Sequence, residues 1–596
     1  MAATNAVIDL AGEAIPDEAM AIRYRAEEAI SQPYEVDVEL SVPVSLDFVA
    51  DDCLRSSVAL AITDDTGERR FFHGIVDRAE YDFFTGTHHH FRLRLRPTLA
   101  SLTHRENSKI WQDMDVVSVV KEVFAEAGID NVEWKLSHSH EGREIIVQYR
   151  ETEFNFVERL FEDEGLFYFF RHKPDGHTLV VADDHASFQP SDDAPEVHFA
   201  LSQGFSGTPI TDFERTRSLR TTDVQVKDYN FEKPQAPPQA DQSAPDKTSM
   251  PYFEYPGGFI KADVGKLRAN AILRARRRDH DLSHGSSRAI GMRCGVPFTV
   301  VGAGQPWLDR EYVCTHLTTW GEQTLESGGE NEVCQNRFRA IESGLPYMAP
   351  RVSRRPRIRG IQTAVVTGPS SENQAIHVDK YGRIKVRFYW DRISQQDDTS
   401  SCWLRVSQLA QGNTMLLPRV GWEMAVAFMD GDPDRPFAMG RIYNGEKVAP
   451  AALPGAKASG GLKSYSTPGG AGINEVHLGD DGGSMGWTLN AQKDLNIIIK
   501  HDKTETIGVD STHAIKVSSE TTIGANETIS VGADQTEAVG SVRSTNVGGS
   551  QTIDVGGNQT NNATHNMLET VAGSRDYSVG GNMTVISNTV MQTVTG

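Results

Sequence analysis

The C-terminal part of the chain repeats an aliphatic side chain at a strict interval of eight residues. The repeated positions are Ile507, Ile515, Ile523, Val531, Val539, Val547, Val555, Val571 and Val579, with Ala563 in the one remaining place. Because eight is even, every repeated side chain falls on the same face of a pleated strand, whereas a helix with about 3.6 residues per turn would scatter them. A short fixed period of this kind indicates a β-helix or solenoid.

A glycine follows the repeated aliphatic residue in most of the repeats. The glycines are Gly508, Gly524, Gly532, Gly540, Gly548, Gly556 and Gly580. Glycine at a fixed place predicts a tight corner between short strands. Residues 488–596 contain neither Trp nor Phe and only one Tyr, so the composition changes abruptly where the repeat begins.

A single chain cannot close a β-helix from this repeat. Ordering the backbone of eight residues costs about 8–16 kcal/mol, whereas burying one valine contributes only about 1.5–3 kcal/mol. Three identical chains wound together would stack the aliphatic side chains on a common axis and pair every backbone edge. We therefore expect an intertwined homotrimer with the nine repeated Ile and Val residues as the core of its axis. The alternative is a disordered polar tail, which gives no reason for β-branched residues to keep register.

The charge of the chain restricts the partners that it can bind. A net charge of −22 argues against nucleic acid, whose binding needs a basic surface. Residues 491–596 hold 11 Asp or Glu and 6 Lys or Arg, which keeps a shaft soluble.

Residues 1–20 lack the basic and apolar regions of a signal peptide, and no stretch is apolar enough for a transmembrane helix. We expect synthesis in the cytoplasm and export by a machine rather than by a leader.

The N-terminal part has the pattern of an α+β region over residues 1–230. Apolar and polar side chains alternate in the stretches that begin at His73 and Phe91, which predicts half-buried strands. The five cysteines are scattered without a CxxC pair. Buried reduced thiols are the favoured interpretation, in preference to disulfides or a zinc ribbon.

Two helices are predicted in this part. Residues 116–127 repeat apolar residues at helical spacing and precede Gly128, which is typical of a helix C-terminus. Thr152 is placed to cap a second helix that ends at Gly165. A buried strand is expected directly after it, over 166–170.

The central part alternates connecting segments with regular structure. Residues 233–251 and 350–359 are predicted to be a surface loop and an inter-domain connector. A basic helix ends at residues 274–278, where a solvated face is favoured over a site for an anionic partner. Short strands and turns over 403–443 suggest a small closed barrel.

Ordered motifs around this barrel resemble the VgrG family of type VI secretion spike proteins. The motifs are DKYGRIKVRFYWDR at 379–392, CWLRVSQ at 402–408, PRVG at 418–421, GDPDRP at 431–436 and GRIYN at 440–444. The stretch VQYRETEFNFVERLFEDEGLFYFFRH at 147–172 and FHGIV at 72–76 resemble the hub motifs of the same family. The resemblance covers nearly the whole chain.

The resemblance implies a mainly β fold in four parts. These are a phage-hub-like base of β-barrels and helices at 1–350, an OB-fold domain at 360–445, a connector at 446–490 and the octad-repeat needle at 491–596. The base is an α+β hub, and the needle is an intertwined triple-stranded β-helix. Residues 446–490 are too few for the lysozyme domain that phage relatives insert there.

The implied function is a homotrimeric spike that punctures target-cell membranes and carries effector proteins. Its implied partners are a hexameric Hcp tube at the base, a PAAR-type protein at the needle tip, baseplate proteins and the target membrane, with no nucleic acid. A spike of a phage tail or of an extracellular contractile injection particle is one alternative. A spike that carries a cell-wall hydrolase is the other.

The sequence nominates no catalytic residue, metal ligand or cofactor site. Residues 482–486 match GxSxG, but the helix that must follow a nucleophile elbow is missing, so a turn is favoured. Alternation along a strand puts only His88 and His90 on one face, with no third metal ligand evident. The acidic residues 162–164 are expected to lie on a solvated helix end. Residues 469–472 lack the spacing of a phosphate-binding loop.

Overall fold

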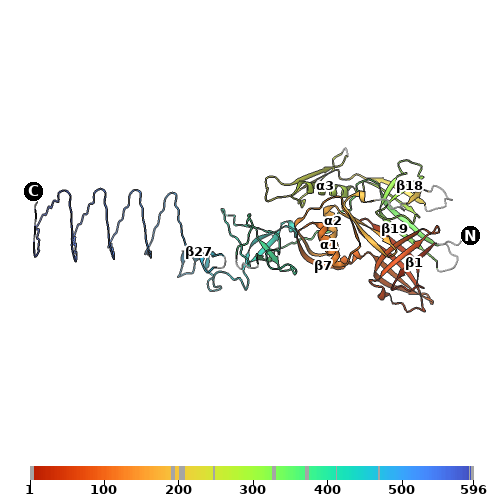
Figure 1. Cartoon of the computed structure of the whole chain (residues 1–596), viewed down its shortest axis with the longest axis horizontal. Coiled ribbons are helices and arrows are strands. Elements are labelled where there is room, and N and C mark those ends of the chain that lie inside the picture. The colour runs from red at the N-terminus through yellow and green to blue at the C-terminus, as the bar shows by residue number, and fades with distance from the viewer. Residues whose placement is uncertain are drawn as a thin grey trace. The chain divides into compact units, whose positions relative to one another are not determined.

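The computed structural model describes residues 6–188, 195–199, 209–245, 248–324, 331–369, 375–410, 412–467, 470–589, 591 and 593. It divides into two units, Met1–Asn496 and Ile497–Gly596. Strands predominate over helices in the first unit, as the sequence predicts (Figure 1). Within the described ranges, no helix has both the length and the apolar character that crossing a membrane requires.

The largest element of the first unit is a sheet of 12 strands. Its main order is β1-β4-β5-β6-β3-β2-β19-β20-β17-β13, with β18 on β19 and β12 on β18. The strands are β1 Val7–Gly12, β2 Met20–Ala29, β3 Gln32–Pro43, β4 Ser57–Thr63, β5 Arg69–Phe84, β6 His88–Arg96, β12 Glu196–His198, β13 Ile210–Arg217, β17 Asp281–Ser287, β18 Pro297–Val301, β19 Glu311–Glu322 and β20 Glu332–Glu342. β5 and β6 confirm the strands predicted around His73 and Phe91.

Two helices cover smaller sheets in the middle of the base. α1 (Val116–Ala127) and α2 (Glu153–Glu164) have the predicted bounds, and Gly128 and Gly165 end them in the left-handed conformation that favours glycine. The hydroxyl of Thr152 accepts a hydrogen bond from the Asn155 amide and caps α2. The strands beside them are β7 Glu106–Met114, β8 Val132–Lys135, β9 Arg143–Thr152, β10 Phe167–Lys173 and β11 Gly176–Ala182. β10 confirms the strand predicted after Gly165.

The predicted loop over 233–251 is wrong in its middle, where Gln239–Ser243 forms β15. This strand pairs with β14 (Asp223–Lys227), which also pairs with β16 (Pro251–Glu254). Only Ala240 of β15 is buried, so an edge strand of polar residues was concealed by its composition. α3 (Ala262–Arg277) packs its apolar face against β14.

The arginines at the end of α3 are less solvated than the sequence predicts. Arg274 lies 3.5 Å from a carboxylate oxygen of Asp184. Arg276 stacks on the ring of Tyr252, and Arg277 donates to the Thr221 carbonyl. These contacts hold the basic helix end on its own domain.

A five-stranded barrel follows, and it begins earlier than the short strands over 403–443 predicted, because two of its strands precede residue 403. Its strands are β21 Gln362–Thr367, β22 Lys385–Phe388, β23 Arg405–Val406, β24 Glu423–Phe428 and β25 Pro436–Ile442, in the order β22-β21-β24-β25-β23. The bridge between Ile384 and Leu404 joins the first strand of this order to the last and closes the barrel. Four 3-10 turns complete the first unit, namely η1 Ala50–Cys53, η2 Thr98–His104, η3 His185–Ser187 and η4 Met429–Gly431.

The first unit ends in a three-stranded antiparallel sheet. Its strands are β26 Ser459–Tyr465, β27 Ile473–Gly479 and β28 Gly486–Asn490. The turn between β27 and β28 contains the GxSxG match, and the Ser484 amide donates to the Asp481 carbonyl at 2.9 Å. The interpretation of this match as a turn is confirmed.

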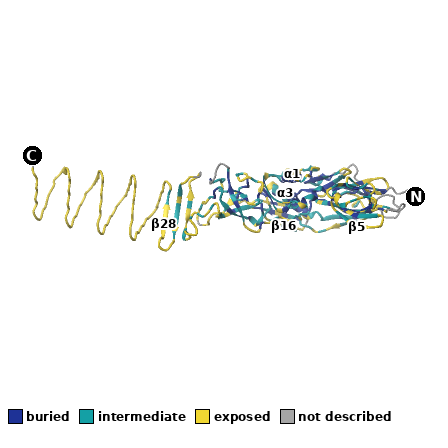
Figure 2. Ribbon diagram, turned by 90° about the horizontal axis from the view of Figure 1, so that it is seen from below, coloured by how far each residue is buried: buried dark blue, intermediate teal, exposed yellow. Residues whose placement is uncertain are grey.

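The second unit is a regular succession of open turns (Figure 1). Its described residues contain no strand and no helix. The backbone bends at residues 508 and 509 and at every equivalent pair up to 580 and 581, again with a period of eight. Figure 2 shows the whole described tail as exposed.

Candidate functional site

The nine repeated aliphatic residues occupy equivalent places in the tail. Each stands directly before a backbone bend, and their side chains are 43–54% exposed. The described isoleucines, leucines and valines of the second unit that lie outside this register are 65–95% exposed. The tail therefore carries one row of aliphatic side chains that is consistently more sheltered than the rest.

The row begins one repeat earlier than the sequence analysis had it. Ile499 stands eight residues before Ile507, precedes a bend and is 46% exposed. It is the last of three consecutive isoleucines, Ile497 to Ile499, so the pattern around it is not a clear octad. The period of eight, counted backwards from Ile507, would have found it.

The tail glycines lie at the bends, but one chain does not require glycine there. No glycine in the described tail has a positive φ. A Cβ added at Gly508, Gly532 or Gly548 would meet no atom within 4 Å, and Lys500 and Lys516 occupy the same place in other repeats. The predicted corners are present without the special backbone conformation expected of them.

The backbone of the described tail also lacks the pairing of a strand or helix. No backbone–backbone hydrogen bond is found in the described part of residues 497–593. Native proteins pair almost all buried amide and carbonyl groups. A tail that packs its aliphatic row must therefore find partners for these groups outside its own chain.

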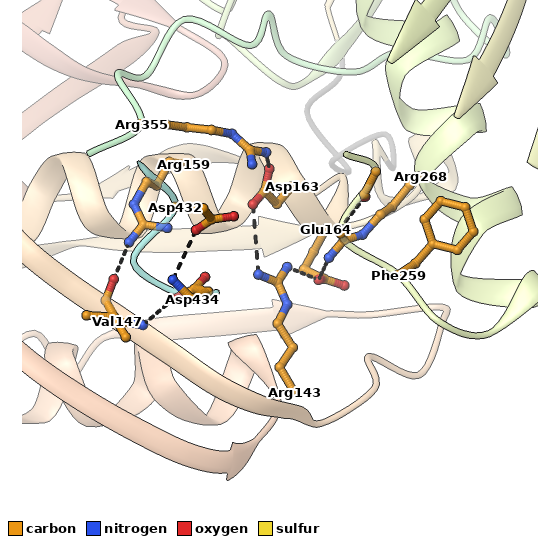
Figure 3. Close-up of polar contacts among 12 residues, drawn as sticks. Arg143, Val147, Arg159, Asp163, Glu164, Phe259, Arg268, Arg355, Asp432 and Asp434 are labelled. Carbon is orange, nitrogen blue, oxygen red and sulfur yellow. Dashed lines mark hydrogen bonds and ion pairs between the residues drawn. The ribbon is translucent and has the colours of Figure 1, made fainter. Parts of the chain in front are cut away.

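A cluster of charged residues lies within the base, beside the connector that leads to the barrel. Asp163 and Glu164, at the C-terminal end of α2, point toward the guanidinium of Arg143 from β9 (Figure 3). Arg268 of α3 lies 3.3 Å from Glu164, and Arg355 of the connector pairs with Asp163. Carboxylates at a helix C-terminus oppose the helix dipole, so these arginines are needed to hold them there.

The arginines determine the ionisation of the acidic pair. Burial acts to raise the pKa of Glu164, but hydrogen bonding to His140 and the charges of Arg143 and Arg268 lower it well below its usual value. The pKa of Asp163 is lowered in the same way, chiefly by Arg355 and Arg143 against the effect of burial. Both carboxylates are therefore charged at neutral pH.

His140 links this pair to β11. Its ring nitrogens lie 3.3 Å from Glu164 and 3.6 Å from Asp183. Burial acts to lower its pKa, but the neighbouring carboxylates of Asp183 and Glu164 raise it to about 9. The imidazolium therefore bridges two carboxylates of the base.

The GDPDRP turn of the barrel docks on β9. Asp434 accepts a hydrogen bond of 2.7 Å from the amide of Val147, whose carbonyl in turn accepts one of 2.7 Å from Arg159 (Figure 3). Arg159 forms a bidentate pair with Glu151. Burial and the charge of Asp432 raise the pKa of Asp434 to about 7. Val147 also belongs to the apolar core of the barrel, so packing and hydrogen bonds join the same two elements.

The loop after β14 makes a second contact with the barrel. Arg435 pairs with Asp228 at 2.5 Å. The guanidinium groups of Arg383 and Arg405 lie 5.1 and 5.5 Å from the ring centre of Phe231. Together with the Asp434–Val147 contact, they define the base–barrel joint, which was not predicted from the sequence.

The acidic residues 162–164 are therefore not the solvated helix end that was predicted. Glu162 accepts hydrogen bonds from the amides of Val352 and Ser353, and the other two are buried among arginines. Those arginines come from distant segments, so their approach could not be seen in the local sequence. The predicted connector over 350–359 supplies several of these contacts.

The remaining candidates show no convergence on a reactive centre. His90 stacks on Phe83 and His89 on Phe84, and the described residues contain no cluster of His, Cys, Asp and Glu with metal-binding geometry. All five cysteines are buried and free, as predicted. Gly469 lies outside the described residues.

Comparisons with known proteins agree with this architecture. Residues 27–325 match the model of the phage tail baseplate hub, and residues 371–443 match the type VI secretion system and phage-baseplate injector OB domain. Residues 460–571 match the C-terminal trimerisation domain of bacteriophage T4 gp5. The spike protein VgrG1b of Pseudomonas aeruginosa is 33% identical over 507 residues, which are 83% of this chain and 68% of that protein. The chain belongs to the VgrG family of type VI secretion spike proteins.

Other members of the VgrG family give the same result. VgrG1a of P. aeruginosa is 30% identical over 83% of this chain and 78% of its own length. Among solved structures, a type VI secretion component of E. coli, described as similar to the T4 tail proteins gp27 and gp5, superposes with a TM-score of 0.54 at 18% identity, over 73% of this chain and 100% of that one. A chain of the half-lidded Francisella PdpA–VgrG complex superposes with a TM-score of 0.51 at 9% identity, over 82% of this chain and 85% of that one. These structures support the VgrG fold, and the chain is a structural spike protein of type VI secretion.

Proposed function

We propose that three copies of this chain wind their tails together into one needle, with the nine repeated aliphatic residues stacked on its axis. The observation that carries the proposal is the uniform partial shelter of that row, at 43–54% exposure, beside neighbours that are far more exposed. Association of three rows would remove the rest of this apolar surface from water. The match of residues 460–571 to a trimerisation domain supports the same stoichiometry.

The unpaired backbone supports intertwining over side-by-side packing. Along the described tail, no backbone amide bonds to a backbone carbonyl of its own chain. If each chain occupies one side of a common prism, its edges meet the edges of its two neighbours, and the closed structure has no free strand edge. Three chains thus satisfy a requirement that one chain cannot.

The needle and the base–barrel joint together suit mechanical work. A push on the base reaches the barrel through the Asp434–Val147 contact and the Arg435–Asp228 pair. A joint that is both packed and hydrogen-bonded deforms little, because protein interiors are close-packed. The spike would thereby convert the stroke of a contracting sheath into puncture of a target membrane.

Further partners follow from membership of the VgrG family. The base would dock on an Hcp-type tube and on baseplate proteins, the needle end would bind a PAAR-type tip protein, and effectors would travel with the spike. The assembled spike would leave the cell with its cargo.

Hydrogen exchange of the full-length protein tests the intertwined needle. Interchain pairing predicts slow exchange of the amides of residues 507–579, at a level comparable with the barrel strands. An unpaired tail would exchange within the dead time of the experiment, and that result would exclude the proposal. The amides of β24 serve as the internal reference for a paired strand.

A further inference from the structure

The three-stranded sheet β26–β28 has one apolar face. Leu462 lies opposite Val476, which lies opposite Leu489, and Leu478 lies opposite Trp487. Directly opposed residues of an antiparallel sheet share a face, so these five side chains form one surface, here called the collar face. The other face carries Lys463 and Glu475, which pair at 3.6 Å, with His477 and Thr488 beside them.

The collar face is uncovered in a single chain. Trp487 is 76% exposed, and Leu462, Leu478 and Leu489 are exposed as well. Figure 2 shows β28 as an exposed strand. A sheet with one apolar face is stable when that face packs on another element, and contiguous exposed apolar side chains mark interaction sites.

The occupant of the collar face is indicated by position in the sequence. The match to the trimerisation domain begins at residue 460, within β26, and continues without a break into the octads. The first aliphatic residue of the octad row, Ile499, follows β28 by only nine residues. The collar face and the octad row therefore belong to one continuous association region, and the partner is a second copy of the chain.

The octads alone leave the register of three chains open. Successive repeats place the same kind of residue at the same position. If one chain shifts by eight residues, its aliphatic row therefore still packs against the aliphatic rows of the other two. Strand register is weakly specified where the pattern repeats itself. Trp487 and its neighbours on the collar face occur once and cannot be matched by a shifted chain.

We infer that the collar faces of three chains pack together and set the register in which the octads wind. This inference rests on the proposed trimer and adds a role to a surface outside the octads. Trp487 is the principal contact, because large aromatic side chains dominate the energetics of such interfaces. Association at the collar makes the shifted pairings of the needle unfavourable before the tails have wound.

The test uses full-length protein with one spin label in the tail. The Val542→Cys variant provides an exposed attachment point, and the five native cysteines are buried. Pulsed dipolar spectroscopy then reports the distances between labels in the assembly. Three chains in one register give a single distance, whereas chains shifted by an octad add longer ones.

Two matched double variants separate the collar face from a general effect on the sheet. Trp487→Asp with Leu478→Asp places charges on the collar face, and His477→Asp with Thr488→Asp places them on the opposite face of the same strands. We expect additional distances or loss of the trimer with the first pair, and an unchanged single distance with the second. If the first double variant forms a trimer with a single distance between spin labels, the inference is overturned, whether or not another protein binds the collar face. If the labelled chain without these changes sediments as a monomer, the proposed trimer fails instead.

Discussion

The carboxylate of Asp434, in the turn before β25, accepts a hydrogen bond of 2.7 Å from the backbone amide of Val147 in β9. The two residues are 287 positions apart and belong to the barrel and the base. Asp434 lies in the GDPDRP motif, which the sequence analysis used only as a family signature. The contact gives that motif a physical role, because it holds the barrel on the base.

Loss of this acceptor will weaken the joint. In Asp434→Ala the Val147 amide stays buried without a partner, which costs about 1–3 kcal/mol. Asp434→Asn keeps an oxygen that can accept the bond, so its effect will be smaller. Denaturant unfolding followed by near-ultraviolet circular dichroism measures both variants. Equal stability of Asp434→Ala and the unchanged protein would contradict the role assigned to this contact.

The buried acidic pair of α2 is expected to matter more than a surface pair. Glu164→Ala leaves Arg143 and Arg268 in a buried site without their carboxylate, and breaking a buried pair in this way costs about 3–5 kcal/mol. Glu133→Ala is the matched control, because Glu133 pairs with Arg171 at an exposed site, where a pair contributes at most about 1 kcal/mol. Thermal unfolding of the two variants should separate them clearly. A Glu164→Ala protein as stable as the control would show that the base does not depend on this cluster for its stability.

The His140 bridge predicts a loss of stability at alkaline pH. Its pKa in the folded protein is about 9, above the value of about 6.5 for an unfolded histidine. The bridge therefore makes its full contribution to the free energy of unfolding below about pH 6.5. This contribution is lost as the pH rises through about 9. The His140→Gln variant should lose this slope while other titrations remain. Parallel stability profiles of the two proteins between pH 6 and pH 10, measured by urea unfolding, would rule out the bridge.

A charge on the needle axis should prevent association. Val539→Asp would bring three carboxylates together near the axis. Their repulsion would destabilise the trimer by at least about 3 kcal/mol. Val542→Asp is the control, because Val542 is outside the register and highly exposed. In sedimentation velocity we expect the first variant to lack the trimer and the second to keep it. In a secretion assay we expect the first variant to be retained in the cell and the second to be secreted. Normal trimers and secretion with Val539→Asp would remove this residue from the axis.

Much of the fold could be predicted because its signals are local. The cap at Thr152, the apolar spacing of α2 and the glycine at Gly165 all lie within one short segment, and the helix has the predicted bounds. The period of eight likewise predicted where the tail bends. Such features depend on neighbours in sequence, which a reader of the sequence can see.

The buried acidic cluster at the end of α2 and the base–barrel joint could not be predicted, because the parts of each are distant in sequence. The end of α2 looks like a solvated acidic helix until Arg143, Arg268 and Arg355 converge on it. The strand β15 was missed for a related reason, since its polar residues are held by pairing with β14 rather than by burial. Tertiary contacts overrode the local pattern in both places.

The most direct test of the intertwined needle is sedimentation equilibrium of the purified full-length protein and of a form lacking residues 491–596. A needle wound from three chains predicts a mass of three times 65.6 kDa for the full-length protein, and weaker association when the tail is removed. A full-length protein that sediments as a monomer would contradict the intertwined needle, and with it the proposal that this spike pierces membranes as a trimer.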